Sequence, residues 1–175
     1  MFILMNTFIA MEAFTLIHIP THMNTFTKRA MYKKILAAID GSVHTQKVLD
    51  TTIALAKAFD SSVEICHAIC MPPMLPDPMG AEVAFMPQMI EDLEKNGKKI
   101  IEDARKYLEN NGIKDISIFM DIANAANMIL ERIKSENFDL VVLGSRGLNE
   151  FEGFLMGSVS DKISHHAKCS VFIVR

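Results

Sequence analysis

The sequence predicts an α/β fold, in which a parallel sheet carries helices on both faces, and two features of the chain support this prediction. Short apolar runs of strand length alternate along the chain with segments of helical spacing. That alternation is typical of parallel sheets built from right-handed strand–helix–strand units. The second feature is the apolar run 140–143, which stops at Gly144 and leads through a glycine-rich segment into a helical pattern. This order of elements presents backbone N–H groups to an anion, usually a phosphate.

Length and composition fit a single domain. The 175 residues are enough to bury one core, and with 50% hydrophobic and 22% charged residues the chain is neither disordered nor fibrous. The formal charge of −3 argues against a general nucleic-acid binder. The cysteines, Cys66, Cys70 and Cys169, are odd in number and lack metal-site spacing. We expect buried thiols in strands at Cys66 and Cys169, and a reducing, cytoplasmic location.

Residues 1–30 differ from the rest of the chain, because they are largely apolar and carry only Glu12, Lys28 and Arg29 as charged residues. No basic region precedes the apolar run and no clear cleavage site follows it, so we do not expect a signal peptide. Residues 1–19 approach the length of a membrane span, but polar residues interrupt them. We therefore expect 1–30 to be an N-terminal extension and 31–175 to be the domain; a membrane anchor is the alternative.

The first strand is expected at residues 33–39 (KKILAAI). It ends at Asp40, and Ser42 is the expected N-cap of the helix that follows. Asp40 is either a ligand-binding residue or merely a helix cap. Apolar residues recur at three- and four-residue steps from Val48 to Phe59, which predicts an amphipathic helix.

The second strand is expected at residues 63–69 (VEICHAI). Residues 71–87 contain five of the six prolines, so we expect an irregular loop, either a lid or partner surface or a disordered connector. Helical spacing resumes from Gln88 to Asn110, and Asn110-Asn111-Gly112 is a stop signal.

The remaining elements continue the alternation. They are a strand at 116–120, a helix around 126–133, a strand at 138–143, a helix at 154–167 and a strand at 170–174. In such Rossmann-like sheets the ligand lies beyond the carboxyl ends of the strands, where the strand order reverses. If the first and fourth strands are neighbours there, Asp40 and Gly144 face one crevice.

The glycine spacing Gly144-x2-Gly147-x9-Gly157-Ser158 resembles that of the ATP-binding universal stress proteins. The resemblance extends over residues 31–175. It includes three shorter segments: Asp40-Gly41-Ser42, Cys66-His67-Ala68 and residues 169–174. If the resemblance did not hold, these glycines could serve only a tight strand-to-helix connection.

The resemblance implies an adenine nucleotide alpha hydrolase-like fold, with an open five-stranded sheet in the order 3-2-1-4-5. It also implies that ATP, with Mg²⁺ or Mn²⁺, binds between strands one and four. A homodimer joined through the last strand, Ser170–Val174, is the implied assembly. The chain gives an independent reason for that dimer, since an apolar edge strand left uncovered invites uncontrolled association. Other protein partners are unidentified, and no nucleic acid or membrane partner is expected.

The resemblance also assigns residues to the two ends of the nucleotide. The adenosine end is expected beside Ala38, Asp40, Ala68, Leu143 and Gly144. The phosphate end is expected beside Arg146, Gly147, Gly157, Ser158, Val159 and Ser160. Glycines allow close approach of the backbone, and a helix start favours negative charge. The chain departs from the family at residues 121–125, where Ala123 and Ala125 replace the usual glycine and proline, so the conformation of this turn is not predicted.

Two functions from different classes follow. The first is a cytoplasmic stress-response regulator, an ATP-binding dimeric sensor or switch. The second is a slow ATPase or phosphotransfer enzyme at the same site, and a structural dimer without nucleotide is disfavoured by the intact glycine spacing. The first is preferred because no Walker lysine follows the glycines and only Glu150 and Glu152 stand near the loop as candidate bases. His67 is expected to be a packed strand histidine, not a base. No catalytic or metal-binding residue is assigned.

Overall fold

The computed structural model describes residues 31–72, 81–147 and 156–175. Strands and helices alternate strictly along them. In chain order they are β1 (Lys34–Ala38), α2 (Thr45–Phe59), β2 (Ser62–Ile69), α3 (Ala81–Asn110), β3 (Ile116–Ile122), α4 (Ala125–Glu136), β4 (Leu140–Gly144), α5 (Ser158–His166) and β5 (Ser170–Val174). The predicted alternation is confirmed.

The strands form one parallel sheet in the order β3-β2-β1-β4-β5, as the resemblance implied. The chain builds outward from β1 in one direction through β3 and then returns to place β4 and β5 on the other side. β1 and β4 are therefore neighbours at the reversal, with Ala38 opposite Leu143 near their carboxyl ends. A ligand crevice is expected at this point of an open α/β sheet.

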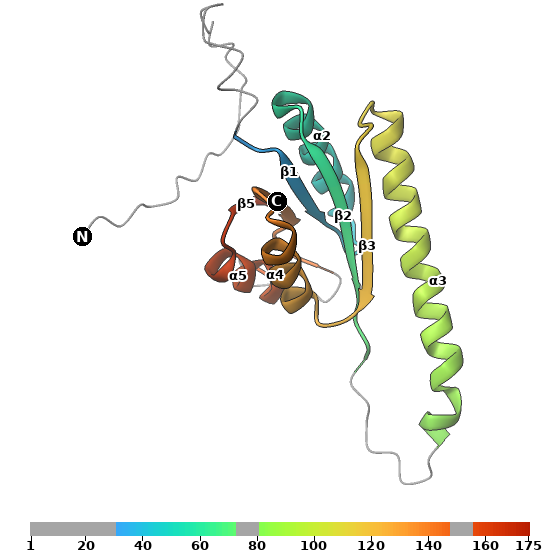
Figure 1. The fold of residues 1–175 in the computed structure, drawn as a ribbon. Coiled ribbons are helices and arrows are strands. Elements are labelled where there is room, and N and C mark those ends of the chain that lie inside the picture. Colours follow the sequence, from blue (N-terminus) through green and yellow to red (C-terminus); the bar gives the residue numbers. More distant parts are fainter. Residues whose placement is uncertain (1–30, 73–80, 148–155) are drawn as a thin grey trace, which may run out of the picture.

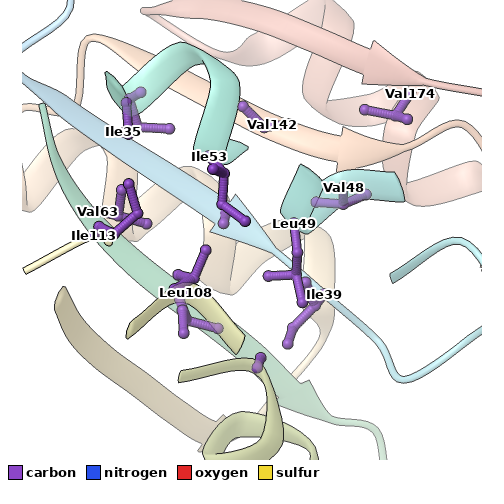
Figure 2. Packing of buried hydrophobic residues seen from close by; sticks show 14 of the residues in the cluster. Ile35, Ile39, Val48, Leu49, Ile53, Val63, Leu108, Ile113, Val142 and Val174 are labelled. Carbon is purple, nitrogen blue, oxygen red and sulfur yellow. The ribbon is translucent and has the colours of Figure 1, made fainter. Parts of the chain in front are cut away.

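Helices α2 and α3 cover one face of the sheet, and α4 and α5 cover the other (Figure 1). Alternate residues of one strand serve the two cores: Ile35 packs under α2 and α3, whereas Leu36 packs under α4 and α5. Figure 2 shows the first core, where Ile53 and Leu108 converge on the strands. Because both faces are covered, β1 and β4 are largely apolar runs without polar alternation, whereas β2 also carries the buried polar residues Glu64 and His67.

The largest difference from the sequence prediction is the start of α3. This helix begins at Ala81 and contains Pro87, whereas the proline-rich loop was expected to last to Pro87. Pro87 is exposed and lies in the second turn of α3, where proline removes one helical hydrogen bond and crowds the carbonyl four residues before it without ending the helix. The first turns of α3 consequently extend past the carboxyl ends of β2 and β3 (Figure 1). Of the expected lid, residues 73–80 lie outside the described chain.

The turn that departs from the family begins a capped helix. Asn124 has extended backbone and its side chain accepts a hydrogen bond from the Asn127 N–H at 3.1 Å, which caps α4 without glycine or proline. The last helix, expected at 154–167, spans Ser158–His166, with Gly157 at its N-cap and Ala167 at its C-cap; residues 154–155 lie outside the described chain. Residues 1–30 do so too, and no helix in the described ranges is long and apolar enough to cross a membrane.

Candidate functional site

A cavity of about 830 Å³ opens at the carboxyl edge of the sheet. The ends of β1, β2 and β4 form its floor, and the first turns of α2 and α5 border it. Every residue that the resemblance assigned to the nucleotide lines this cavity: Ala38, Asp40, Ala68, Leu143, Gly144, Arg146, Gly147, Gly157, Ser158, Val159 and Ser160. The structure therefore brings the whole predicted set together, while the contact of each residue with a nucleotide stays a prediction.

The turn between β1 and α2 is held by its own side chains. Asp40 Oδ1 accepts the Ser42 N–H at 3.0 Å, Ser42 Oγ accepts the His44 N–H at 3.3 Å, and Thr45 Oγ1 accepts the Gly41 N–H at 3.1 Å. The prediction that Ser42 caps the helix is wrong, because its hydroxyl is used within the turn and α2 has His44 at its N-cap position. Asp40 is likewise a turn residue and not a cap, and its second oxygen, Oδ2, faces the glycine loop.

The glycine loop between β4 and α5 is closed at its base by a single carbonyl. The Ser145 oxygen accepts the Gly157 N–H at 2.8 Å and the Ser160 hydroxyl at 2.8 Å. The Ser145 N–H in turn donates to the Val174 oxygen of β5 at 2.7 Å. Ser160 is only 2% exposed, so its hydroxyl fixes the shape of the loop, whereas its backbone N–H belongs to the first turn of α5. The loop residues 148–155 lie outside the described chain.

Gly147 brings the loop against the end of β1. A methyl group on its Cα would lie 2.7 Å from Asp40 Oδ2, closer than van der Waals contact allows. Gly157 is less constrained, since a methyl group there would meet Ser145 O and Arg146 Cα at 3.4 Å. Asp40 and Gly147, separated by more than 100 residues in the sequence, thus face each other across the crevice.

The start of α5 supplies backbone donors and positive potential. The Asp161 N–H donates to Gly157 O at 2.9 Å, so the N–H groups of Ser158, Val159 and Ser160 precede the hydrogen-bonded part of the helix. Such a helix start favours an anion, and Arg146 adds a cationic side chain to the same wall. The geometry at this end of the cavity suits a phosphate.

The cavity offers few protein ligands for a cation that would accompany a nucleotide. Within the described ranges, no three His, Cys, Asp or Glu side chains cluster as a metal site. Mg²⁺ that travels with a nucleotide needs only one or two carboxylates besides the phosphates. Asp40 and Asp161 are the acidic residues of the lining.

Sequence reasoning missed much of the cavity wall. The additional lining residues are Ile39, His44, Thr45, Val48, Cys66, His67, Ile69, Cys70, Leu93, Asn96, Ile100, Ala125, Met128, Ile129, Met156 and Asp161. His44 matters most for chemistry, because the sequence showed no histidine beside the glycine loop. A methyl group built on Gly144 would lie 3.4 Å from His44 Cβ, so this histidine borders the loop after all.

The cysteines are free, and two of them line the cavity. Burial raises the pKa of the Cys66 thiol to about 12, and the neighbouring carboxylate of Glu64 acts in the same direction. Cys66 is therefore a protonated, packed thiol, as expected. Cys169 precedes β5 and is only half-buried, contrary to expectation, although burial raises its pKa to about 11. Cys70 is exposed.

These observations define an open α/β protein with a glycine-rich loop and a cavity at the topological switch point. The sequence model of the Universal stress protein family matches residues 31–175. The universal stress protein YxiE of Bacillus subtilis is 32% identical over 149 residues, which span 83% of this chain and 100% of the relative. A putative universal stress protein of Staphylococcus aureus is 28% identical over 145 residues, or 82% of this chain and 84% of the relative. The chain belongs to the universal stress protein family.

Solved structures show the same fold. The universal stress protein UspA from Lactobacillus plantarum superposes with a TM-score of 0.73 at 18% identity, covering 83% of this chain and 99% of its own. A universal stress protein in complex with cAMP gives 0.59 at 23% identity, with 83% and 97% covered. A family member from Arabidopsis thaliana with AMP bound gives 0.58 at 17% identity, with 81% and 90% covered.

Proposed function

We propose that this chain is an ATP-binding stress-response regulator that acts as a nucleotide-dependent dimeric switch. The observation that carries the proposal is the single cavity that unites the motif residues of β1, β2, β4 and α5. Adenosine lies beside Ala38, Ala68 and Leu143, and the phosphates lie against the glycine loop and the start of α5. Relatives with the same fold that hold cAMP and AMP support an adenine nucleotide as the ligand class.

The proposal extends to the whole chain. Residues 31–175 form the nucleotide-binding domain, and 1–30 are an extension outside it. Two copies pair through β5, whose outer edge has no strand beside it in the described part of the chain. The protein works in the cytoplasm, and Mg²⁺ or Mn²⁺ accompanies the phosphates.

Calorimetric titration of ATP tests the site directly. The wild type binds ATP, and Gly147→Val abolishes binding, because the added side chain projects toward Asp40 and into the space of the phosphates. Gly112→Ala is the matched control: Gly112 ends α3, its Cβ would meet no atom within 4 Å, and it lies outside the cavity lining. That variant should bind ATP like the wild type. Equal binding by the wild type and Gly147→Val would remove the phosphate assignment.

A second candidate function is slow ATP hydrolysis, and His44 is the observation that favours it. Its side chain lines the cavity beside Gly144, where an imidazole can serve as a general base for water. A multiple-turnover assay with magnesium separates the two functions. If His44 acts as the base, His44→Ala lowers the turnover rate on the order of 100-fold while ATP affinity is kept. If the protein only binds ATP, the wild type shows no turnover in this assay, and His44→Ala has no rate to lower.

A further inference from the structure

The cavity extends over both faces of the sheet, and the proposed adenosine lies on only one of them. The residues proposed to lie beside adenosine, Ala38, Ala68 and Leu143, pack with the core under α4 and α5. Ile39 and Ile100 line the same cavity but pack with the core under α2 and α3. We call this second part of the cavity the α3 lobe. Its residues are Ile39, His67, Ile69, Leu93, Asn96 and Ile100.

Helix α3 forms a fixed outer wall for this lobe. Gly97 lets the helix approach β2 closely, since a methyl group there would lie 3.2 Å from Ile69 Cδ1. Leu93, Asn96 and Ile100 follow one another at three- and four-residue steps, so they share the face of α3 that borders the cavity. None of these side chains is charged. The helix continues past the carboxyl ends of β2 and β3, so the wall extends beyond the strands (Figure 1).

His67 is the polar strand residue of the α3 lobe. Side chains of a strand alternate between the faces of a sheet, so His67 projects to the same face as Ile65, which packs in the core under α2 and α3. His67 is 7% exposed, and it belongs to the cavity lining. The proposed function leaves this nearly buried imidazole without a role.

The tautomer of His67 follows from its hydrogen bond. Nδ1 lies 3.0 Å from the Ile39 carbonyl oxygen, which can only accept, so Nδ1 carries a proton and Nε2 of the neutral imidazole is an acceptor. Within the described ranges no fully buried side-chain nitrogen or oxygen lacks a partner, and Nε2 has no hydrogen bond there. Nε2 is therefore not fully enclosed, and it offers the lobe an acceptor of fixed orientation.

The charged residues of the cavity lining lie toward the glycine loop. A methyl group on Gly147 would meet Asp40 Oδ2, Arg146 belongs to the loop, and Asp161 lies in the first turn of α5. An acceptor nitrogen does not favour an anion. In the described part of the chain, no three His, Cys, Asp or Glu side chains cluster to hold a metal ion. Apolar walls around one fixed polar group suit a neutral organic molecule.

We propose that the α3 lobe is a second ligand site, which takes a small neutral organic molecule with an apolar body and a hydroxyl group. The hydroxyl donates to His67 Nε2, and the apolar body packs between Ile69, Leu93 and Ile100. Because the lobe and the proposed adenosine site lie on opposite faces of the sheet, both are occupied together. The inference goes beyond the proposed function and does not require that a nucleotide binds.

Phenol is the probe, because its ring is apolar and its hydroxyl is a neutral donor at pH 7. Toluene has nearly the same shape without the donor. In NMR titrations of the full chain, we expect phenol to bind roughly tenfold more tightly than toluene, since only phenol satisfies the acceptor. Phenol should also shift the nitrogen-15 resonance of His67 Nε2. Undetectable phenol binding, or equal affinities for the two probes, would overturn the proposal.

A titration of phenol with ATP present separates this site from the proposed nucleotide site. Phenol should stay bound when ATP is added. Displacement of phenol by ATP would place the probe in the nucleotide part of the cavity and overturn the proposal. If ATP itself does not bind, the proposed function fails, whereas the comparison of phenol with toluene still decides the role of the α3 lobe.

The variant His67→Asn tests the acceptor. Its amide N–H can still donate to the Ile39 carbonyl, but it has no acceptor at the depth of Nε2. Toluene should bind as to the wild type, and the preference for phenol should fall to within about twofold. A folded His67→Asn protein that keeps the preference would overturn the role of His67.

The variant Leu93→Trp tests the lobe without altering the hydrogen bond between His67 and Ile39, so it remains decisive if His67→Asn does not fold. The larger side chain should fill the lobe and abolish the binding of both probes. Lys98→Trp is the matched control, because Lys98 also lies on α3 but its side chain is 67% exposed and outside the lining. That control should bind phenol like the wild type. Equal phenol binding by the two tryptophan variants would show that the probe binds elsewhere and overturn the proposal.

Discussion

A charged pair between β2 and α4, with Glu64 buried and Arg132 partly buried, illustrates what single residues contribute. Arg132 donates to both carboxylate oxygens of Glu64, at 2.6 Å and 2.8 Å, and the Ser117 hydroxyl adds a third hydrogen bond at 3.2 Å. The Glu64 side chain is 6% exposed. The hydrogen bond to Glu64 raises the pKa of Arg132, and partial burial of the guanidinium opposes that effect. The pair satisfies a carboxylate that would otherwise be buried alone.

Loss of one partner should be costlier than loss of both. Arg132→Met leaves the Glu64 carboxylate buried without its cation and should lower the free energy of unfolding by roughly 3–5 kcal/mol. The double variant Glu64→Leu with Arg132→Met should recover most of that loss, since an apolar pair suits the same space. Urea unfolding followed by circular dichroism measures both.

The exposed pair of Arg105 and Glu109 on α3 is the matched control. Both side chains are 46% exposed, so Arg105→Ala should change stability by less than about 1 kcal/mol. Equal costs for Arg132→Met and Arg105→Ala would show that burial gives the Glu64 pair no special weight.

At the scale of residues, the glycine motif predicted where the candidate site lies but not the other residues that line its cavity. Glycine spacing identified Gly144 to Ser160 because close backbone approach requires particular residues at particular intervals. His44, His67 and Asn96 carry no such signature, since periodicity places a residue on a face without saying what that face meets. Glu64 within an apolar strand likewise signals a buried partner, but Arg132 becomes that partner only once α4 packs on the sheet.

At the scale of elements, the β1–α2 turn depends on a glycine for two separable reasons. Gly41 has φ 80°, and a methyl group there would lie 2.7 Å from Ile100 Cδ1 of α3. Gly41→Ala should therefore lose about 1–2 kcal/mol from left-handed backbone strain, plus the cost of displacing Ile100. Thermal or urea unfolding gives the total.

Gly112 allows the backbone strain to be measured without the clash with Ile100. It has the same left-handed backbone conformation as Gly41, but no neighbouring side chain. Its φ is 84° and its Cβ would meet no atom within 4 Å, so Gly112→Ala reports the strain alone. The Gly41 variant should be the less stable of the two, and the difference measures how closely α3 presses on the turn. If the two variants lose the same stability, the Ile100 side chain moves aside at no measurable cost, and α3 does not constrain the turn.

Element types followed from the sequence more closely than element boundaries did. Burial on both faces made β1 and β4 largely apolar runs that could be recognised as strands, and the strand order followed from the resemblance. The start of α3 was missed because Pro87 was taken as a helix breaker, although the structure accommodates this exposed proline within the second turn of the helix. The late start of α2 was missed because Ser42, Thr45 and Asp40 form a side-chain-bonded turn that resembles a cap in sequence.

At the scale of the whole molecule, β5 connects the proposed dimer edge to the nucleotide loop. It is the outermost strand of the sheet, with Phe172 42% exposed, and its Val174 oxygen accepts the Ser145 N–H at the base of the loop. A second copy paired along β5 would therefore contact a strand whose end is fixed to the phosphate site. The proposed pairing and the proposed nucleotide binding would both act on this strand, which would couple them physically.

Sedimentation of the wild type and two edge variants checks this arrangement. The wild type should be a dimer, and Phe172→Asp should be a monomer, because a charge in the middle of the paired edge would be desolvated without a partner. Ile118→Asp is the control, since Ile118 is 48% exposed on β3 at the opposite edge and should leave the dimer intact. Dimeric Phe172→Asp would place the interface elsewhere.

All proposed nucleotide residues come from one chain, so the monomer should still bind ATP. If the proposed switch exists, the monomeric variant and the wild-type dimer should bind ATP with different affinities. ATP should then also change the dissociation constant of the wild-type dimer, because the two effects are reciprocal.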